Sequence, residues 1–183
     1  MRSISCSTNK SVRRAILLSS TVISARSAEI DVVALCGYSS IITGEIADNF
    51  VTINIHPANL RRKDKAGKRM YAGMLGMSSI KSAILNGDKE LRSTAHMVTP
   101  KVDEGPIMMV SKPVKINVSG KEMKNPELLD AAARRSMEEL KEKGDWKIYP
   151  ETLRLLAEGR FAVDEKGALC LDGKPIPEGH EMA

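Results

Sequence analysis

Residues 51–57, VTINIHP, decide the fold and carry the most informative side chains of the chain. The first five of these residues are mostly β-branched, which predicts a strand. Because side chains alternate along a strand, Thr52, Asn54 and His56 share one face, and Pro57 keeps His56 extended and ends the strand. Polar side chains at the end of a buried strand need partners, or a site that uses them. On spacing alone, a hydrogen-bonded core histidine beside a strand-ending asparagine fits equally well.

Around this strand, apolar runs alternate between strand-like and helix-like periods. The expected strands are 30–36, 51–55, 92–99 and 107–114, the expected helices are 44–49, 78–85, 125–143 and 149–158, and a hairpin pairs 161–163 with 168–171. This order predicts an α/β fold with a mostly parallel sheet, an antiparallel edge, flanking helices and a closing β-hairpin. Ligands of open α/β sheets bind at the carboxyl ends of the strands, where Asn54 and His56 would lie.

The amino-terminal part differs in composition from the rest. Residues 1–28 contain five basic residues and no acid, and this excess equals the net charge of +5. Residues 1–10 read as a loose, Ser-rich arm, and the apolar spacing of 11–23 predicts a helix. Such starts are also typical of transit peptides, but the spacing leads directly into a strand, which favours a helix packed on the sheet. We therefore expect an arm plus helix over 1–28 and one catalytic domain over 29–183.

Composition excludes several classes of function. No apolar stretch approaches the ~18 residues that span a membrane. Cys6, Cys36 and Cys170 lie far apart without CxxC spacing, and the chain has three histidines, which argues against a disulfide framework or a metal centre. Basic charge gathered at one end is not the spread basic face of a nucleic-acid-binding protein. We expect a cytoplasmic protein that acts on small molecules.

Three long blocks are more specific than any single motif. They are INIHPANL (53–60), STAHMVTPKVDEGPIMMVSKPV (93–114) and IYPETLRLLAEGRFAVDEKGALCLDGKPIP (148–177). They closely resemble successive blocks of the phosphoribosylglycinamide formyltransferase family, and AEIDVVALCGYSSIIT (28–43) resembles the family's preceding strand and loop. The resemblance implies a Rossmann-like fold and the transfer of a formyl group from 10-formyltetrahydrofolate to an amine. In purine biosynthesis this amine is glycinamide ribonucleotide.

The resemblance assigns catalytic roles to Asn54, His56 and Asp103. Attack of an amine on a formyl group creates a tetrahedral oxyanion, to which the amide of Asn54 could donate a hydrogen bond. A protonated His56 could donate as well, or relay a proton. We expect Asp103 to favour the charged imidazole and to take the proton of the amine through a water.

The resemblance also implies binding residues, with no metal among the cofactors. Backbone groups of two segments would hold the folate, at Tyr38, Ser40, Ile42, His96, Val98 and Thr99. For His96 a buried, hydrogen-bonded histidine is the favoured interpretation. Gly37 and Ile55 would line the acceptor side. Asp145, separated by two residues from Ile148-Tyr149-Pro150, would bind the amine where a glutamate is usual in the family.

Two departures from the family leave alternatives open. No strand, Gly-rich loop and helix precede residue 28 to cradle the acceptor phosphate, so the amino-terminal part of the sheet is expected to be missing or replaced. The loop 61–69 is strongly basic, and a solvated loop is favoured over an anion clamp. A homo-oligomer could cover sheet left exposed. The alternatives are a truncated, non-catalytic folate- or partner-binding remnant, another acceptor, or hydrolysis of formyltetrahydrofolate.

Overall fold

A computed structural model describes residues 15–18, 30–37, 42, 44–165 and 167–182. Its main sheet has six strands in the order β1-β2-β3-β5-β6-β11. Their bounds are β1 Ala15–Leu18, β2 Val32–Leu35, β3 Val51–His56, β5 Thr94–Met97, β6 Ile107–Val110 and β11 His180–Glu181. The pairs β1–β2, β2–β3 and β6–β11 are parallel, whereas β5 is antiparallel to both of its neighbours. The α/β class is confirmed, with the antiparallel strand inside the sheet.

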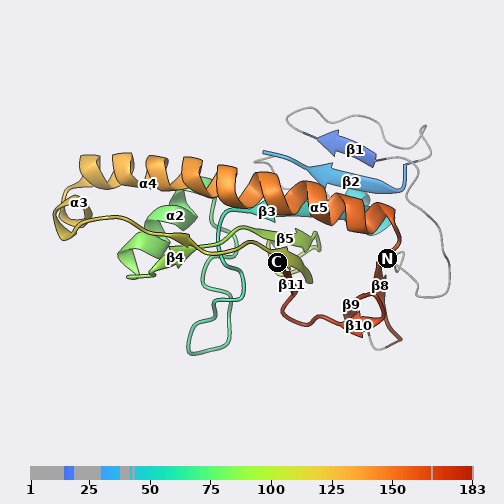
Figure 1. Ribbon diagram of the computed structural model, residues 1–183. Helices are drawn as coiled ribbons and strands as arrows, with labels where there is room; N and C mark the ends of the chain where they lie inside the picture. The colour runs from blue at the N-terminus through green and yellow to red at the C-terminus, as the bar shows by residue number, and fades with distance from the viewer. Residues whose placement is uncertain (1–14, 19–29, 38–41, 43, 166, 183) are drawn as a thin grey trace.

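A long helical rod crosses one face of this sheet (Figure 1). It consists of α4 (Pro126–Leu140), a π-helical turn η2 (Lys141–Asp145) and α5 (Trp146–Ala157), so the two helices predicted from the sequence are joined. The side chain of Asn125 caps α4 by accepting from Leu128 N. Gly144 lets the rod approach the sheet, since a Cβ there would lie 2.3 Å from Ser93 Oγ. The hydroxyl of Tyr149 then donates to Leu35 O at 2.7 Å, which ties α5 to the sheet.

The remaining elements are short. They are α1 Gly44–Asn49, α2 Gly76–Leu85, α3 Gly120–Lys124, the pair β4 Glu90–Leu91 and β7 Val114–Lys115, and the three strands β8 Phe161–Val163, β9 Leu169–Leu171 and β10 Lys174–Pro175. The antiparallel pairing of β8 with β9 confirms the predicted closing hairpin. In the described part of the chain, no helix combines the length and apolar character needed to cross a membrane.

The core is divided by the two faces of the sheet. One face of β3 and β5 packs Ile53 and Ala95 against Ile148 and Leu155 of α5. A second cluster joins α2, α4 and the start of loop 58–73, and a small third cluster packs α1 near the opposite face of β2. Apolar packing on the α5 side leaves the polar face of β3, with Thr52, Asn54 and His56, directed away from α5.

The helix predicted over residues 11–23 is wrong at residues 15–18. These residues form β1, which pairs with β2 in register Leu18↔Leu35, while Leu35 pairs with Asn54 of β3. A strand therefore precedes β2 in the sheet, where the sequence indicated none. Four consecutive apolar residues fit a buried parallel strand as well as a helix face, so periodicity could not decide. Residues 1–14 and 19–29 lie outside the described residues, and the homo-oligomer stays a prediction.

Candidate active site

The polar face of β3 continues onto β5. In this antiparallel pair Asn54 lies opposite His96, and His56 lies opposite Thr94. Directly opposed residues project from the same face of a sheet, so Asn54, His56 and His96 share one face. A β-bulge between Ala95 and His96 re-aims the strand at this point, as bulges beside functional sites do. Alternation along the strand thus gathers the predicted polar residues.

Asp103 reaches the same place from the turn between β5 and β6. Its Oδ2 lies 3.5 Å from Nδ1 of His56, and its Oδ1 lies 3.4 Å from Nε2 of His96. Both histidines are buried, with 4% and 1% of their surface exposed. The structure therefore brings His56, His96 and Asp103 into one group, which we call the buried cluster. His96 is buried and hydrogen-bonded, as favoured from the sequence, and it also contacts the predicted catalytic carboxylate.

The turn that carries Asp103 is tight and unusual. Asp103 has a φ of 54°, a left-handed conformation that aspartate tolerates better than most residues. Two residues later, Gly105 approaches β5 so closely that a Cβ would lie 1.8 Å from Met97 O. The Met97 N–H donates to Pro106 O at 2.9 Å and closes the turn. This close approach leaves no room for a side chain at position 105.

Burial sets the charge states of the cluster. It lowers the pKa of His56 below its ordinary value, and the opposing influence of Asp103 does not offset it. Asp103 does favour the charged imidazole, as expected, but the larger effect of burial does not leave His56 protonated at neutral pH. Burial tends to raise the pKa of Asp103, but contact with His96, the nearby His56 and the Gly73 N–H lower it overall. At neutral pH the group combines an ionised carboxylate with a neutral His56 imidazole.

Several polar atoms here have no hydrogen-bond partner among the residues that the structure describes. Nε2 of His56 is buried without a hydrogen bond to any described residue, although Nδ1 of His96 lies 2.9 Å from Met97 O. The half-buried amide of Asn54 likewise makes no hydrogen bond with the described residues. Native proteins rarely leave buried polar atoms unpaired without a functional reason. A neutral imidazole nitrogen and a free amide are suited to contact a reacting group.

The predicted folate-binding residues are only partly described. Tyr38 and Ser40 lie outside the described residues. Ile42 and Val98 pack in the same small cluster as Leu35, and Val98 N donates to Thr52 O at 2.7 Å, extending the contact of β5 with β3. The hydroxyl of Thr99 bonds Lys101 O.

The acceptor-side residues are not gathered into one group. Gly37 is exposed at the end of β2 with a φ of 66°, and Ile55 packs on the α5 side of the sheet. Asp145 ends the π-helical turn. Burial raises the pKa of Asp145, and a contact with Ser93, which lowers the pKa, only partly offsets this effect. Its Oδ1 is buried without a hydrogen bond to any described residue. The described residues do not bring Asp145 into contact with the buried cluster. The π-helical turn that Asp145 ends is nevertheless a feature often found at functional sites.

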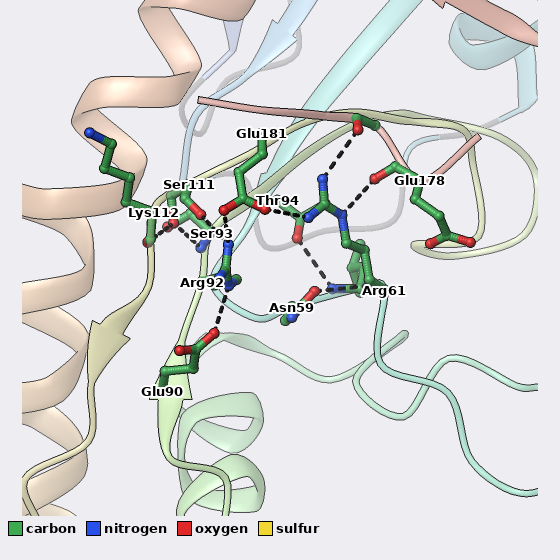
Figure 2. Close-up of polar contacts among 12 residues, drawn as sticks. Asn59, Arg61, Glu90, Arg92, Ser93, Thr94, Ser111, Lys112, Glu178 and Glu181 are labelled. Atoms are coloured by element: carbon green, nitrogen blue, oxygen red, sulfur yellow. Dashed lines mark hydrogen bonds and ion pairs between the residues drawn. The ribbon is translucent and has the colours of Figure 1, made fainter. Parts of the chain in front are cut away.

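The basic loop is exposed over residues 62–68, which agrees with the favoured solvated loop. Three of its basic side chains nevertheless have acidic partners. Arg61 bonds Glu178 O at 2.6 Å and pairs with Glu181 at 2.8 Å, as Figure 2 shows. Arg62 pairs with Asp88, and Lys63 pairs with Glu178. These pairs occupy three of the charges that an anion clamp would need.

Two residues of this loop region contact Asp103 and were missed. Arg69 donates to the carbonyl oxygens of Asp103 and Gly105, and the Gly73 N–H donates to Asp103 Oδ2 at 2.8 Å. Contacts made by backbone oxygens or backbone N–H groups leave no pattern in a sequence, so no signal in the sequence pointed to Arg69 or Gly73. Within the part of the chain that the structure describes, no group of three or more His, Cys, Asp or Glu is arranged to hold a metal ion.

Comparison with known proteins agrees with this geometry. The family model described as formyl transferase matches residues 5–134. The chain is similar to the phosphoribosylglycinamide formyltransferases of Haemophilus influenzae and Escherichia coli, with 30% identity over 156 residues and 28% over 149 residues. These matches cover 84% and 80% of this chain but 61% and 58% of the relatives, so the chain spans about three fifths of their length.

Solved structures show the same fold. Glycinamide ribonucleotide transformylase 1 from Symbiobacterium toebii superposes with a TM-score of 0.57 and 27% identity, over 80% of this chain and 58% of that one. The phosphoribosylglycinamide formyltransferase of Coxiella burnetii gives a TM-score of 0.60 at 22% identity, over 86% and 64% of the two chains.

Proposed function

Because the chain belongs to the formyl transferase family, we propose that it transfers the formyl group of 10-formyltetrahydrofolate to a primary amine, with glycinamide ribonucleotide as the acceptor. The observation that carries this proposal is the buried cluster, in which an ionised Asp103 lies 3.5 Å from a neutral His56. The free amide of Asn54 projects from the same face. These are the groups that acyl transfer to an amine requires.

The charge states suggest a division of roles. The amine attacks the formyl carbon, a C–N bond forms, and the carbonyl oxygen becomes an oxyanion that the Asn54 amide stabilises by donating a hydrogen bond. Nδ1 of His56 faces Asp103, so the unpartnered Nε2 is free to take a proton from the amine. When the bond from the formyl carbon to the folate nitrogen breaks, this proton passes to that nitrogen. Asp103 supports the imidazolium that forms in between.

Recognition of the folate would rest on backbone groups beside an apolar patch. The backbone of 38–42 and of 96–102 would hold the pterin, with Ile42, Val98 and Leu35 as an apolar surface beside it. Flat heteroaromatic ligands bind where a mostly apolar surface carries a few polar groups. The family likeness supports this placement, and it remains part of the proposal.

The acceptor is supported by the relatives named as phosphoribosylglycinamide formyltransferases. Asp145 is the proposed contact for the amine, through its unpartnered Oδ1. Water is the second candidate acceptor, because the described residues do not bring Asp145, the proposed contact for the amine, against the buried cluster, and water needs no such contact. Both acceptors would use the same buried cluster.

The test is to supply purified protein with 10-formyltetrahydrofolate and glycinamide ribonucleotide, and to measure tetrahydrofolate, formylated product and free formate separately. Transfer predicts tetrahydrofolate and formylated product in equal amounts. Formate without dependence on the amine would identify the hydrolase instead. Folate binding without turnover would favour the non-catalytic remnant and refute the proposal.

A further inference from the structure

Arg69 is a largely buried cation whose partners are backbone oxygens of the catalytic turn. Its side chain is 13% exposed. Nη1 donates to Asp103 O at 2.6 Å and to Gly105 O at 2.9 Å, and Nε lies 3.9 Å from a carboxylate oxygen of Glu104. One guanidinium thus holds both ends of the turn 103–105.

This turn needs an external restraint. Asp103 occupies a left-handed conformation that non-glycine residues adopt rarely, and such conformations persist where the surroundings enforce them. Four residues after Arg69, the Gly73 N–H donates to Asp103 Oδ2 at 2.8 Å. The same segment therefore grips the backbone of Asp103 and its carboxylate.

The segment that carries Arg69 is itself fixed. Lys63 and Arg69 form an antiparallel bridge, and Met70 N donates to Arg62 O at 2.9 Å, so 62–70 is a small hairpin. This backbone pairing can hold Arg69 in one place, as a freely moving loop could not.

We propose that Arg69 is a positioning residue that sets the Asp103 carboxylate against His56 and His96. The role belongs to the proposed formyl transfer, because it acts through Asp103 and not on the substrate. Both bonds come from Nη1, whose two N–H groups are fixed in the plane of the guanidinium, whereas a lysine ammonium is a compact charge on a flexible stem.

The kinetic arm compares Arg69→Gln and Arg69→Lys with Arg62→Gln, a matched control in the same hairpin whose partner is Asp88. Misplacement of a catalytic group by about 1 Å can cost roughly 100-fold in rate. We expect Arg69→Gln to lower kcat roughly 10- to 100-fold with KM for the folate changed less than about threefold. Arg62→Gln should keep kcat within about twofold. In an Asp103→Asn background, Arg69→Gln should cost little more, because both changes remove the same group.

The second arm needs no turnover, so it separates this inference from the proposed function. The imidazole of His56 is titrated by NMR in the wild type, Arg69→Gln, Asp103→Asn and Arg62→Gln proteins. Asp103 raises the pKa of His56, so a displaced carboxylate should lower that pKa toward the value in Asp103→Asn. Arg62→Gln should titrate as the wild type.

A folded Arg69→Gln protein with the wild-type His56 titration would overturn the inference, whatever the activity. If Arg69→Gln does not fold, Arg69→Lys decides, with an intermediate shift expected and a wild-type titration contradicting the role. Absence of turnover in the wild type would refute only the proposed formyl transfer.

Discussion

The buried cluster and the group of charges at the carboxyl terminus are built in opposite ways. His56, His96 and Asp103 are largely removed from water, Nε2 of His56 has no hydrogen bond to any described residue, and the backbone of Asp103 is left-handed. The terminal cluster, which we define as Arg61, Arg92, Glu178 and Glu181, lies nearer the surface. In it Glu181 accepts from both arginines at 2.8 Å (Figure 2).

The difference indicates that the buried cluster serves the reaction, whereas the terminal cluster holds the end of the chain against the loop. Burying polar groups without complete pairing and holding an uncommon backbone conformation both cost stability, so such an arrangement is kept where it has a use. Exposed ion pairs contribute about 0–1 kcal/mol each. Substitution in the buried cluster should therefore change the reaction far more than the fold, and substitution in the terminal cluster should change neither by much.

The largest effect is expected from Asn54→Ala and Asp103→Asn. Each should lower kcat roughly 10²- to 10³-fold, because one removes a donor to the oxyanion and the other removes the carboxylate beside His56. The free energy of unfolding should change little. Steady-state formyl transfer and urea denaturation measure the two quantities.

Asn59→Ala is the matched control for Asn54→Ala. Among the described residues, the Asn59 side chain accepts from Arg61 N, in the loop that follows the strand. Its kcat should stay within about twofold of the wild type, whereas wild-type kcat in Asn54→Ala would remove Asn54 from the mechanism.

The sequence predicted the strand β3 and the shared face of its polar residues, because period-two alternation is a local property. It also indicated that Asn54 and His56 lie at the carboxyl end of a buried strand. The approach of Asp103 came only from the family resemblance, since contacts between residues 47 positions apart are not written in spacing. The neutral state of His56 could not be predicted, because desolvation depends on the packing of distant segments.

Two structural features were not predictable for different physical reasons. The run Ala15–Leu18 is too short for its period to distinguish strand from helix, and its parallel pairing with β2 decided the matter. The role of Arg69 rests on backbone carbonyls, which every residue possesses. The sequence therefore could not distinguish Arg69 from the other basic residues of the loop.

The next largest effect concerns the support of the buried cluster. A Cβ on Gly105 would lie 1.8 Å from Met97 O, a backbone atom that cannot move without breaking the turn. Gly105→Ala should destabilise the protein by about 1–3 kcal/mol, as overpacking does, and should lower kcat by displacing Asp103. Thermal and urea unfolding measure the first change.

Gly120→Ala provides the comparison, since no atom lies within 4 Å of the added methyl at the start of α3. It should be neutral or slightly stabilising, because alanine favours the helix. Equal stability of the two variants would contradict the close approach at Gly105.

A smaller effect is expected from pH on stability. The pKa of His56 is lowered on folding, so the unfolded chain binds the proton more readily between that lowered value and about 6.5. The folded state should lose stability as pH falls through this window, by at most about 1.4 kcal/mol per pH unit for one proton. Asp103 acts in the same direction at lower pH, since its lowered pKa stabilises the fold until the carboxylate is protonated.

Urea denaturation between pH 8 and pH 5, compared with His56→Gln, measures the contribution of His56. The variant should show a flatter dependence on pH. If the stability of the wild type rises as the pH falls, the buried imidazole is charged. The buried cluster would then be an ion pair like those of the terminal cluster.

The smallest effect is expected from Glu181→Gln in the terminal cluster. This change removes the carboxylate that accepts from Arg61 and Arg92, yet leaves the pairing of β11 with β6 and the Arg61 contacts to the backbone at 178 and 179. We expect a loss of about 0.5–1 kcal/mol that becomes smaller in 1 M salt, because exposed pairs are screened. Glu165→Gln, an exposed carboxylate with no ion pair among the described residues, should change stability less. A fall in kcat like that of Asp103→Asn would mean that the terminal cluster positions the reacting groups through Arg61, and the two clusters would then act as one.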